Sequence, residues 1–235
     1  MTAAASPEDQ RTPADVFGRK RELERLGAAI VPGGSALILG PKGMGKSALL
    51  SAARRLAFQG GFATGLAAVT DRNEVTLVRL LESLGVPAAA HRGTRTLVRA
   101  LFRWCGTHRC AVFLDDADRG NTGWLHTLRR LALETSASTF VAARTGPADA
   151  PDRLRRALLS GTEVRLGPLS HSAARSLARS AGVPAELVDE VVRRSAGVPV
   201  AIVEMAKRHR CTRYRIGGRI AWDLLLADLR LSNRL

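Results

Sequence analysis

Residues 36–50 read Ala-Leu-Ile-Leu-Gly-Pro-Lys-Gly-Met-Gly-Lys-Ser-Ala-Leu-Leu. The first four residues predict a buried strand, the glycines predict a tight loop, and the apolar residues after them predict a helix. Gly40 to Ser47 form the pattern G-x-x-x-x-G-K-S. Such a loop presents backbone N–H groups and the positive end of a helix to a phosphate. The alternative is a strand-turn-helix with no ligand, and the apolar segments on both sides favour the phosphate loop.

Two side chains of this loop carry specific expectations. Lys46 would reach the β- and γ-phosphates of a nucleotide, and Ser47 would hold Mg²⁺. The chain has no N-K-x-D sequence of the kind that GTPases use to read guanine, which favours ATP. The predicted nucleotide-binding residues of the loop are Gly40, Pro41, Lys42, Gly43, Met44, Gly45, Lys46, Ser47 and Ala48.

The composition indicates a basic globular chain. Its 235 residues are 46% hydrophobic but only 4% aromatic, which predicts one domain, or one with a small appendage, around a core of Leu, Val and Ala. The 36 basic residues exceed the 21 acidic ones, for a net charge of +15. This excess favours an anionic partner such as DNA or RNA, or a membrane surface. The alternative is a coding bias toward arginine, which does not by itself explain the shortage of acids.

The cysteines and the N-terminus favour a cytoplasmic protein. Three cysteines, an odd number, argue against a disulfide framework. The cysteines and nearby histidines match no common spacing of zinc ligands, and we expect no metal at them. These residues are Cys105, His108, Cys110, His209 and Cys211. Residues 1–15 have the composition of a flexible tail without a signal peptide, and no apolar run is long enough for a transmembrane helix.

Alternating apolar segments predict a parallel α/β sheet with helices on both faces, over a core of residues 16–167. The predicted strands are residues 35–39, 62–69, 110–116, 138–143 and 162–166. Helices are predicted at 46–58, 73–84, 94–104, 124–133 and 153–159, with a loop at 146–152. Three short helices, 172–181, 185–195 and 199–207, predict a small helical lid over residues 168–210.

Residues 211–235 form a basic C-terminal segment. From 206 to 235 the chain has eight basic residues against two acids. An apolar stripe at helical spacing lies within it: Ile220, Leu224, Ala227 and Leu231. The stripe could dock a partner protein, or the segment could bind a membrane surface, although Asp223 and Asp228 weaken the membrane hypothesis.

Three further positions lie at the ends of predicted strands and therefore at the sheet edge where ligands bind. Asp115 would hold Mg²⁺ opposite Ser47, and Asp116 would act as general base toward water. The alternative is that Asp116 and Asp118 cap the next turn. Arg144 would contact the γ-phosphate or stabilise charge in the transition state, its alternative being a surface salt bridge.

Farther along, three arginines are candidates for a finger that reaches into a neighbouring subunit: Arg153, Arg155 and Arg156. The alternative is a solvated basic face.

The combination of motifs resembles the AAA+ superclass, and more closely its STAND branch and the origin-recognition-type ATPases. Five features within residues 16–206 carry the resemblance: Phe17-Gly18-Arg19 with Glu22-Leu23, the Walker A motif Gly40–Ser47, the Walker B end Leu114-Asp115-Asp116, Ala142-Ala143-Arg144 at the sensor 1 position, and Gly197-Val198-Pro199. The resemblance implies that Phe17, Gly18 and Arg19 lie against adenine, and that Pro199 in the lid contacts the nucleotide.

Two departures from these families affect the functional expectation. About 25 residues follow the lid, too few for the winged helix that such proteins usually carry, so DNA binding does not simply carry over. Asp116 stands where many members have Glu, which predicts slow hydrolysis suited to a switch.

We therefore expect an ATPase switch that uses ATP and Mg²⁺, oligomerises through an arginine supplied to a neighbouring subunit, and binds the DNA or RNA backbone. Two alternatives remain open: a nucleotide-dependent signalling or scaffold module that docks a partner protein, and a membrane-surface ATPase.

Overall fold

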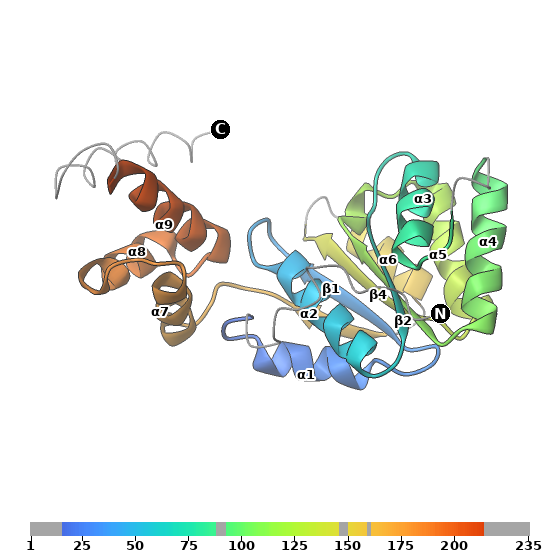
Figure 1. Cartoon of the computed structure of the whole chain (residues 1–235), viewed down its shortest axis with the longest axis horizontal. Helices are drawn as coiled ribbons and strands as arrows, with labels where there is room; N and C mark the ends of the chain where they lie inside the picture. The colour runs from blue at the N-terminus through green and yellow to red at the C-terminus, as the bar shows by residue number, and fades with distance from the viewer. Residues whose placement is uncertain (1–15, 88–92, 146–149, 159–160, 214–235) are drawn as a thin grey trace. The chain divides into compact units, whose positions relative to one another are not determined.

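The computed structural model describes residues 16–87, 93–145, 150–158 and 161–213. It divides into two compact units, residues 1–167 and 168–235 (Figure 1). The predicted tail at 1–15 and the apolar stripe between 220 and 231 lie outside the described residues.

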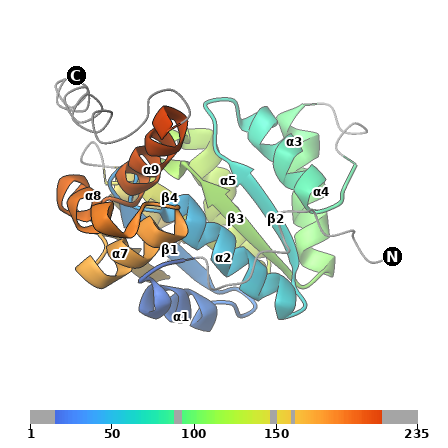
Figure 2. The same ribbon diagram turned by 60° about the vertical axis from the view of Figure 1, so that its left-hand side comes forward.

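The first unit is built on a five-stranded parallel sheet. Its strands are β1 Ser35–Gly40, β2 Ala63–Ala68, β3 Cys110–Asp115, β4 Ser138–Arg144 and β5 Thr162–Arg165. Their spatial order is β2-β3-β4-β1-β5, and every described neighbouring pair is parallel (Figure 2). The predicted fold class is confirmed. The order also places β4 between β1 and β3, so the ends of these three strands are adjacent.

The central strands are buried on both faces, which explains their continuous apolar sequences. Phe113 of β3 stands opposite Phe140 of β4 in register, and their rings stack with centroids 4.8 Å apart. Such a pair contributes about 0.5–1.5 kcal/mol beyond its buried area. The pair stabilises the contact between β3, which ends in Asp115, and β4, which ends in Arg144.

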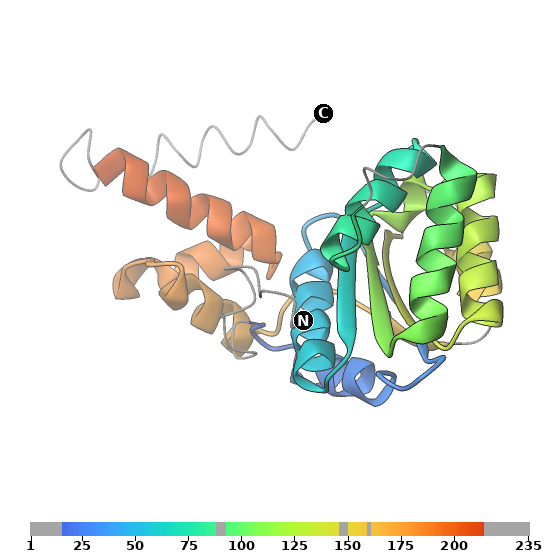
Figure 3. The same cartoon turned by 45° about the vertical axis from the view of Figure 1, so that its right-hand side comes forward.

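Helices cover both faces of the sheet. They are α1 Lys20–Ala28, α2 Lys46–Gln59, α3 Asn73–Ser83, α4 Thr94–Thr107, α5 Thr122–Glu134 and α6 Ala150–Leu158. Helices α4, α5 and α6 bury leucines against one face, in a cluster with Leu39 of β1 and Leu114 of β3. Helix α2 packs on the opposite side, with α1 beside it, and Figure 3 shows the sheet between α2 and the α4–α5 pair.

Two helix boundaries differ from the prediction for local reasons. Helix α5 begins at Thr122 because the Asn121 side chain caps it, accepting a hydrogen bond of 2.9 Å from the Trp124 backbone N–H. Helix α6 begins at Ala150, inside the loop predicted for residues 146–152. Pro151 is tolerated there, because a residue in the first turn needs no intrahelical donor.

The second unit is helical and has its own apolar core. It contains α7 His171–Ser180, the short η5 Ala185–Leu187, α8 Val188–Ser195 and α9 Pro199–Arg213. Small and branched side chains fill the core, among them Ala174, Val188, Val191, Val192 and Ile202. Helix α9 continues across the boundary predicted between 210 and 211. None of the helices within the described residues is both long enough and apolar enough to cross a membrane.

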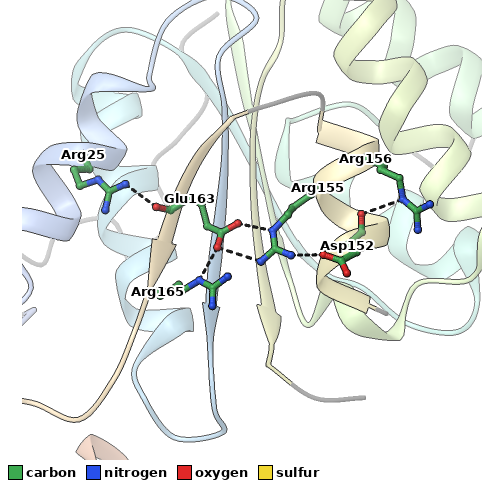
Figure 4. A network of polar contacts seen from close by, with 6 residues as sticks. All are labelled: Arg25, Asp152, Arg155, Arg156, Glu163 and Arg165. Carbon is green, nitrogen blue, oxygen red and sulfur yellow. Dashed lines mark hydrogen bonds and ion pairs between the residues drawn. The ribbon is translucent and has the colours of Figure 1, made fainter. Parts of the chain in front are cut away.

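An ionic network fastens the edge strand β5 to its neighbours (Figure 4). The carboxylate of Glu163 on β5 accepts bonds from Arg155 of α6, at 2.6 and 3.2 Å, and from Arg165, at 2.7 Å. The Glu163 backbone carbonyl accepts a bond of 2.7 Å from Arg25 of α1. The hydrogen bonds from Arg155, more than those from Arg165, lower the pKa of Glu163 to about 2, although partial burial opposes this shift.

This network predicts an acid-sensitive contribution to stability. Because the pKa of Glu163 is depressed in the folded chain, its contribution is present above the usual carboxyl pKa of 4.5 and is lost as the pH falls toward about 2. We expect Glu163→Gln to lower Tm at neutral pH by about 2–4 °C, corresponding to about 1 kcal/mol for a partly exposed network. Urea unfolding between pH 5 and 2, as a difference from wild type, checks this.

Glu134→Gln is the control, because Glu134 is also ion-paired, but with Arg130 alone and on the exposed face of α5. We expect almost no change in Tm for this variant. An equal loss of stability in the two variants, or a Glu163→Gln difference that is constant from pH 5 to 2, would contradict the interpretation.

Candidate functional site

The predicted phosphate loop begins where β1 meets β5. A Cβ atom added to Gly40, the last residue of β1, would lie 2.9 Å from the Leu166 carbonyl oxygen, a backbone atom that cannot move aside cheaply. The Leu166 backbone N–H donates to the Leu39 carbonyl at 2.7 Å, which holds this approach in place. Glycine is therefore required at position 40 by the close contact between strands.

The loop ends in a left-handed glycine that opens α2. Gly45 has φ 86° and precedes Lys46, the first residue of the helix. The N–H groups of Lys46, Ser47 and Ala48 occupy the first turn, where no helical carbonyl is available to them. No acceptor for them is found among the described residues. Three unpaired donors at the positive end of a helix form a cradle that fits a phosphate group.

Lys46 lies folded over the loop that precedes it. Its side chain is almost fully buried, and Nζ donates to the carbonyls of Gly40 at 2.9 Å and Pro41 at 2.8 Å. Burial lowers the pKa of Lys46, while Asp115, Asp118 and Asp116, in that order, oppose the shift. The site therefore combines a desolvated ammonium group with several carboxylates. A phosphate that replaces the two carbonyls would stabilise the charged form of the lysine.

The paired acids lie at the end of β3, as the sequence predicted. Asp115 is the last residue of the strand, and its Oδ1 accepts a 2.9 Å hydrogen bond from the backbone N–H of Asp116. Asp116 adopts a left-handed conformation, with φ 50° and ψ 36°. That conformation costs a residue other than glycine about 1–3 kcal/mol, although Asp tolerates it better than most. The described residues give the carboxylate of Asp116 no hydrogen-bond partner.

Arg144 lies beside the start of the phosphate loop. It ends β4 directly opposite Gly40 in register, and the neighbouring Thr145 N–H donates to the Gly40 carbonyl at 3.3 Å. The carboxylate of Asp118 binds Arg144 twice: it accepts from the backbone N–H at 3.0 Å and from Nε at 2.9 Å. Sequence reasoning considered Asp118 only as a turn residue. Asp118 comes only three residues after the end of β3, and this position could have indicated that it lies near the site.

The donor set at this edge suits a hard cation only together with a ligand. Ser47 offers a hydroxyl in the first turn of α2, and Asp115 offers a carboxylate at the end of β3. Within the described residues, no three His, Cys, Asp or Glu side chains gather into a metal-binding group. Mg²⁺ commonly binds through one or two protein ligands plus phosphate oxygens and water, so the hydroxyl and the carboxylate fit that requirement.

Arg19 of the predicted adenine-binding box is engaged within the first unit. Its guanidinium is almost completely buried, donates to the Gly167 carbonyl, and pairs with Glu22 at 3.1 Å. These contacts tie the start of α1 to the end of the first unit. Contact of Phe17, Gly18 or Arg19 with adenine stays a prediction. So does contact of Pro199, which is the first residue of α9 in the second unit.

The three candidate finger arginines have different environments on α6. Arg155 is held by Glu163 and by Asp152, in the network of Figure 4. Arg156 donates from Nε to the Asp152 carbonyl at 3.3 Å. Arg153 is half-buried and has no side-chain partner in the part of the chain that the structure describes. Of the three, Arg153 is the most available to reach a second molecule.

Comparisons with known proteins support the fold. No family model and no curated protein matches the sequence. Aeropyrum pernix Orc1, solved in complex with DNA, matches the structure with a TM-score of 0.67 and 19% identity, over 92% of this chain and 65% of the Orc1 chain. Domain III of the Thermotoga maritima replication initiation protein DnaA matches with a TM-score of 0.69 and 16% identity, over 96% of this chain and 98% of the domain III chain. AMPPCP-bound DnaA from Aquifex aeolicus matches with a TM-score of 0.58 and 17% identity, over 86% of this chain and 64% of the DnaA chain.

The fold is the one found in Orc1 and in domain III of DnaA, which agrees with the family resemblance seen in the sequence. The identities are low, so the likeness concerns the fold. The chain spans a little less than two thirds of the Orc1 chain and of the Aquifex DnaA chain, and nearly the whole of the isolated domain III.

The contact at Gly40 gives a prediction about the loop. We expect Gly40→Ala to destabilise the chain by about 1–3 kcal/mol, because the added methyl group overpacks against the Leu166 carbonyl. Gly106→Ala is the control, since position 106 lies in α4 and a Cβ there meets nothing within 4 Å. The control should be neutral or stabilising by up to about 1 kcal/mol. Thermal unfolding checks both, and equal effects would refute the steric argument.

Proposed function

We propose that this chain is an ATP-binding switch of the AAA+/STAND type that hydrolyses ATP slowly and acts in the cytoplasm. The observation that carries the proposal is the arrangement at one sheet edge. Lys46 follows β1, Asp115 ends β3, and Arg144 ends the strand between them. Parallel sheets bind ligands at this edge. The nucleotide seen in a structural neighbour, AMPPCP in Aquifex aeolicus DnaA, supports the choice of ligand.

Each residue has a stated role in this proposal. The N–H groups from Lys46 to Ala48 bind phosphate oxygens, and the Lys46 ammonium moves from the loop carbonyls to the β- and γ-phosphates. Mg²⁺ held by Ser47 and Asp115 would neutralise charge on the phosphates. Asp116 orients water and accepts its proton, and Arg144 stabilises charge on the γ-phosphate.

Two parts of the proposal rest on the family resemblance. Phe17, Gly18 and Arg19 contact adenine and Pro199 contacts the nucleotide from the second unit, so the bound state would set the angle between the two units. Self-assembly would present an arginine to the neighbouring copy's phosphates. We favour Arg153 for that role, because Arg155 is already engaged with two carboxylates.

Loss of the loop lysine tests the whole assignment. We expect Lys46→Ala to weaken ATP binding by about 100-fold, because it removes a charge-assisted contact with the phosphates. Lys20→Ala is the control, since Lys20 is an exposed lysine on α1 whose nearest acidic partner is 4.0 Å away. Calorimetric titration gives the affinities, and phosphate release with light scattering gives hydrolysis and oligomer size in the same samples. Normal ATP binding by Lys46→Ala would refute the site.

We further propose that the chain binds nucleic-acid backbone through α4. This helix has three arginines and no acidic residue. Arg95, Arg99 and Arg103 are exposed and recur every four residues, opposite the buried stripe of Leu97, Leu101 and Cys105. No side-chain partner is found for these arginines within the described residues.

Phosphate binding explains a feature that folding alone does not. Like charges one turn apart destabilise a helix, so an unpaired arginine stripe has a cost that an anionic partner would remove. The stripe is about 12 Å long, and a nucleic-acid strand carries one phosphate per about 3.4 Å of helix axis. DNA in the solved Orc1 complex supports this choice of partner.

Salt dependence tests the stripe. Replacing Arg95, Arg99 and Arg103 together by Gln should lower the slope of log K against log salt by about 2–3, because each phosphate contact contributes about 0.7–0.9. The control makes the same charge change on three separate helices, at exposed Arg21, Arg129 and Arg179. Fluorescence anisotropy with labelled DNA, with and without ATP, gives the affinities. A wild type that binds no DNA at low salt, or a control with an equal loss, would refute this clause.

A further inference from the structure

We propose that Asp118 is the positioning residue for Arg144, and that it holds the arginine so that its free N–H groups can recognise the γ-phosphate. This inference rests on the proposed function and names a residue that neither the motifs nor the family resemblance assigns. Asp118 lies in the short helix η4, Ala117–Arg119, which directly follows Asp115 and Asp116.

The geometry is a two-point clamp on a single arginine. One carboxylate oxygen of Asp118 accepts the backbone N–H of Arg144 at 3.0 Å, and the other accepts Nε at 2.9 Å. The clamp therefore fixes both the end of β4 and the side chain that leaves it. A free arginine side chain has many rotamers, and holding Nε removes most of that freedom before any ligand binds.

The contact leaves the binding edge of the guanidinium unused. Nε is occupied, while the two terminal nitrogens have no hydrogen-bond partner among the described residues. These nitrogens are the fork with which arginine binds phosphate oxygens. Arg144 is opposite Gly40 in register. The strand that carries these nitrogens therefore ends beside the first residue of the phosphate loop.

Burial distinguishes this pair from an ordinary surface salt bridge. The side chain of Asp118 is only 13% exposed, whereas that of Arg144 is 41% exposed. A carboxylate this buried needs its partner, while the guanidinium keeps access to solvent and to a ligand. The acid therefore acts as the fixed member of the pair and the arginine as the member that meets the nucleotide.

A positioning role predicts an effect specific to the third phosphate. ADP lacks the γ-phosphate, so loss of the clamp should leave ADP binding nearly unchanged. We expect Asp118→Ala to lower the preference for ATP over ADP by about tenfold and kcat by at least as much. Asp118→Glu should restore part of both, because the longer carboxylate can still accept from Nε. The readouts are calorimetric Kd values for ATP and ADP, and kcat and KM for hydrolysis.

A double-mutant comparison tests whether Asp118 acts through Arg144. Arg144→Ala should reproduce the Asp118→Ala phenotype, and the double variant should be no worse than either single variant. Glu134→Ala is the matched control, because Glu134 also binds one arginine with both carboxylate oxygens, at 2.7 and 2.8 Å, on exposed α5. It should leave the ATP to ADP ratio and kcat unchanged.

The possible outcomes separate this inference from the proposed function. If wild type binds neither nucleotide, the proposed function fails and the inference fails with it. If wild type prefers ATP and the Asp118 variants keep that preference, or lose ADP binding equally, only the inference is overturned. Additive losses in the double variant also overturn it. Should Asp118→Ala not fold, as judged by its Tm, Asp118→Asn gives the same decision, because it keeps the side-chain volume but not the charge.

Discussion

The parallel contact of β1 with both β4 and β5 is the constraint on which the candidate site depends. On one side the Leu166 carbonyl approaches so closely that β1 must end in glycine. On the other side the register places Arg144 opposite that same glycine. The start of the phosphate loop and the place of the arginine therefore follow from strand pairing. Because backbone hydrogen bonds fix the register, neither position can shift without breaking the sheet.

Charge balance is the second constraint on the site. Lys46 is almost fully buried, which alone would favour the neutral amine, and Arg144 adds further positive charge nearby. Three carboxylates oppose this, on Asp115, Asp116 and Asp118. One of them is committed to Arg144, and another accepts a hydrogen bond from its neighbour's backbone. The two cationic and three anionic side chains of the site therefore have a net charge of −1. Its free donors are the backbone N–H groups at the start of α2 and the terminal nitrogens of Arg144.

Sequence patterns predicted the local parts of this arrangement and not the pairings between distant residues. The loop after β1, the acids at the end of β3 and the arginine at the end of β4 were predicted because each comes at the end of a continuous apolar stretch. The bond between Asp118 and Arg144 joins residues that are 26 positions apart, one in η4 and the other at the end of β4, so no local pattern reports it. Arg155 was a candidate finger because the sequence does not show its pairing with Glu163, which lies on a different element.

The helix boundaries depended on single side chains, whose effect the spacing of apolar residues does not reveal. The cap at Asn121 and the tolerated Pro151 moved two helix starts by a few residues, without affecting which residues reach the site. The expectations for adenine and lid contacts stay predictions, because they require the two units to meet around a nucleotide.

The surplus of positive charge becomes more informative once its distribution is known. Several arginines are neutralised locally, as in the network around Glu163 and in the pair between Arg130 and Glu134. The net charge of +15 already subtracts these paired charges, but it does not say where the unpaired cations lie. The arginines of α4 differ, because they line one exposed face without acids on their own helix. Screened, dispersed charges attract any polyanion weakly, whereas a regular stripe can hold several phosphates of one strand at once. The case for nucleic-acid binding therefore rests on the pattern along α4 rather than on the overall charge.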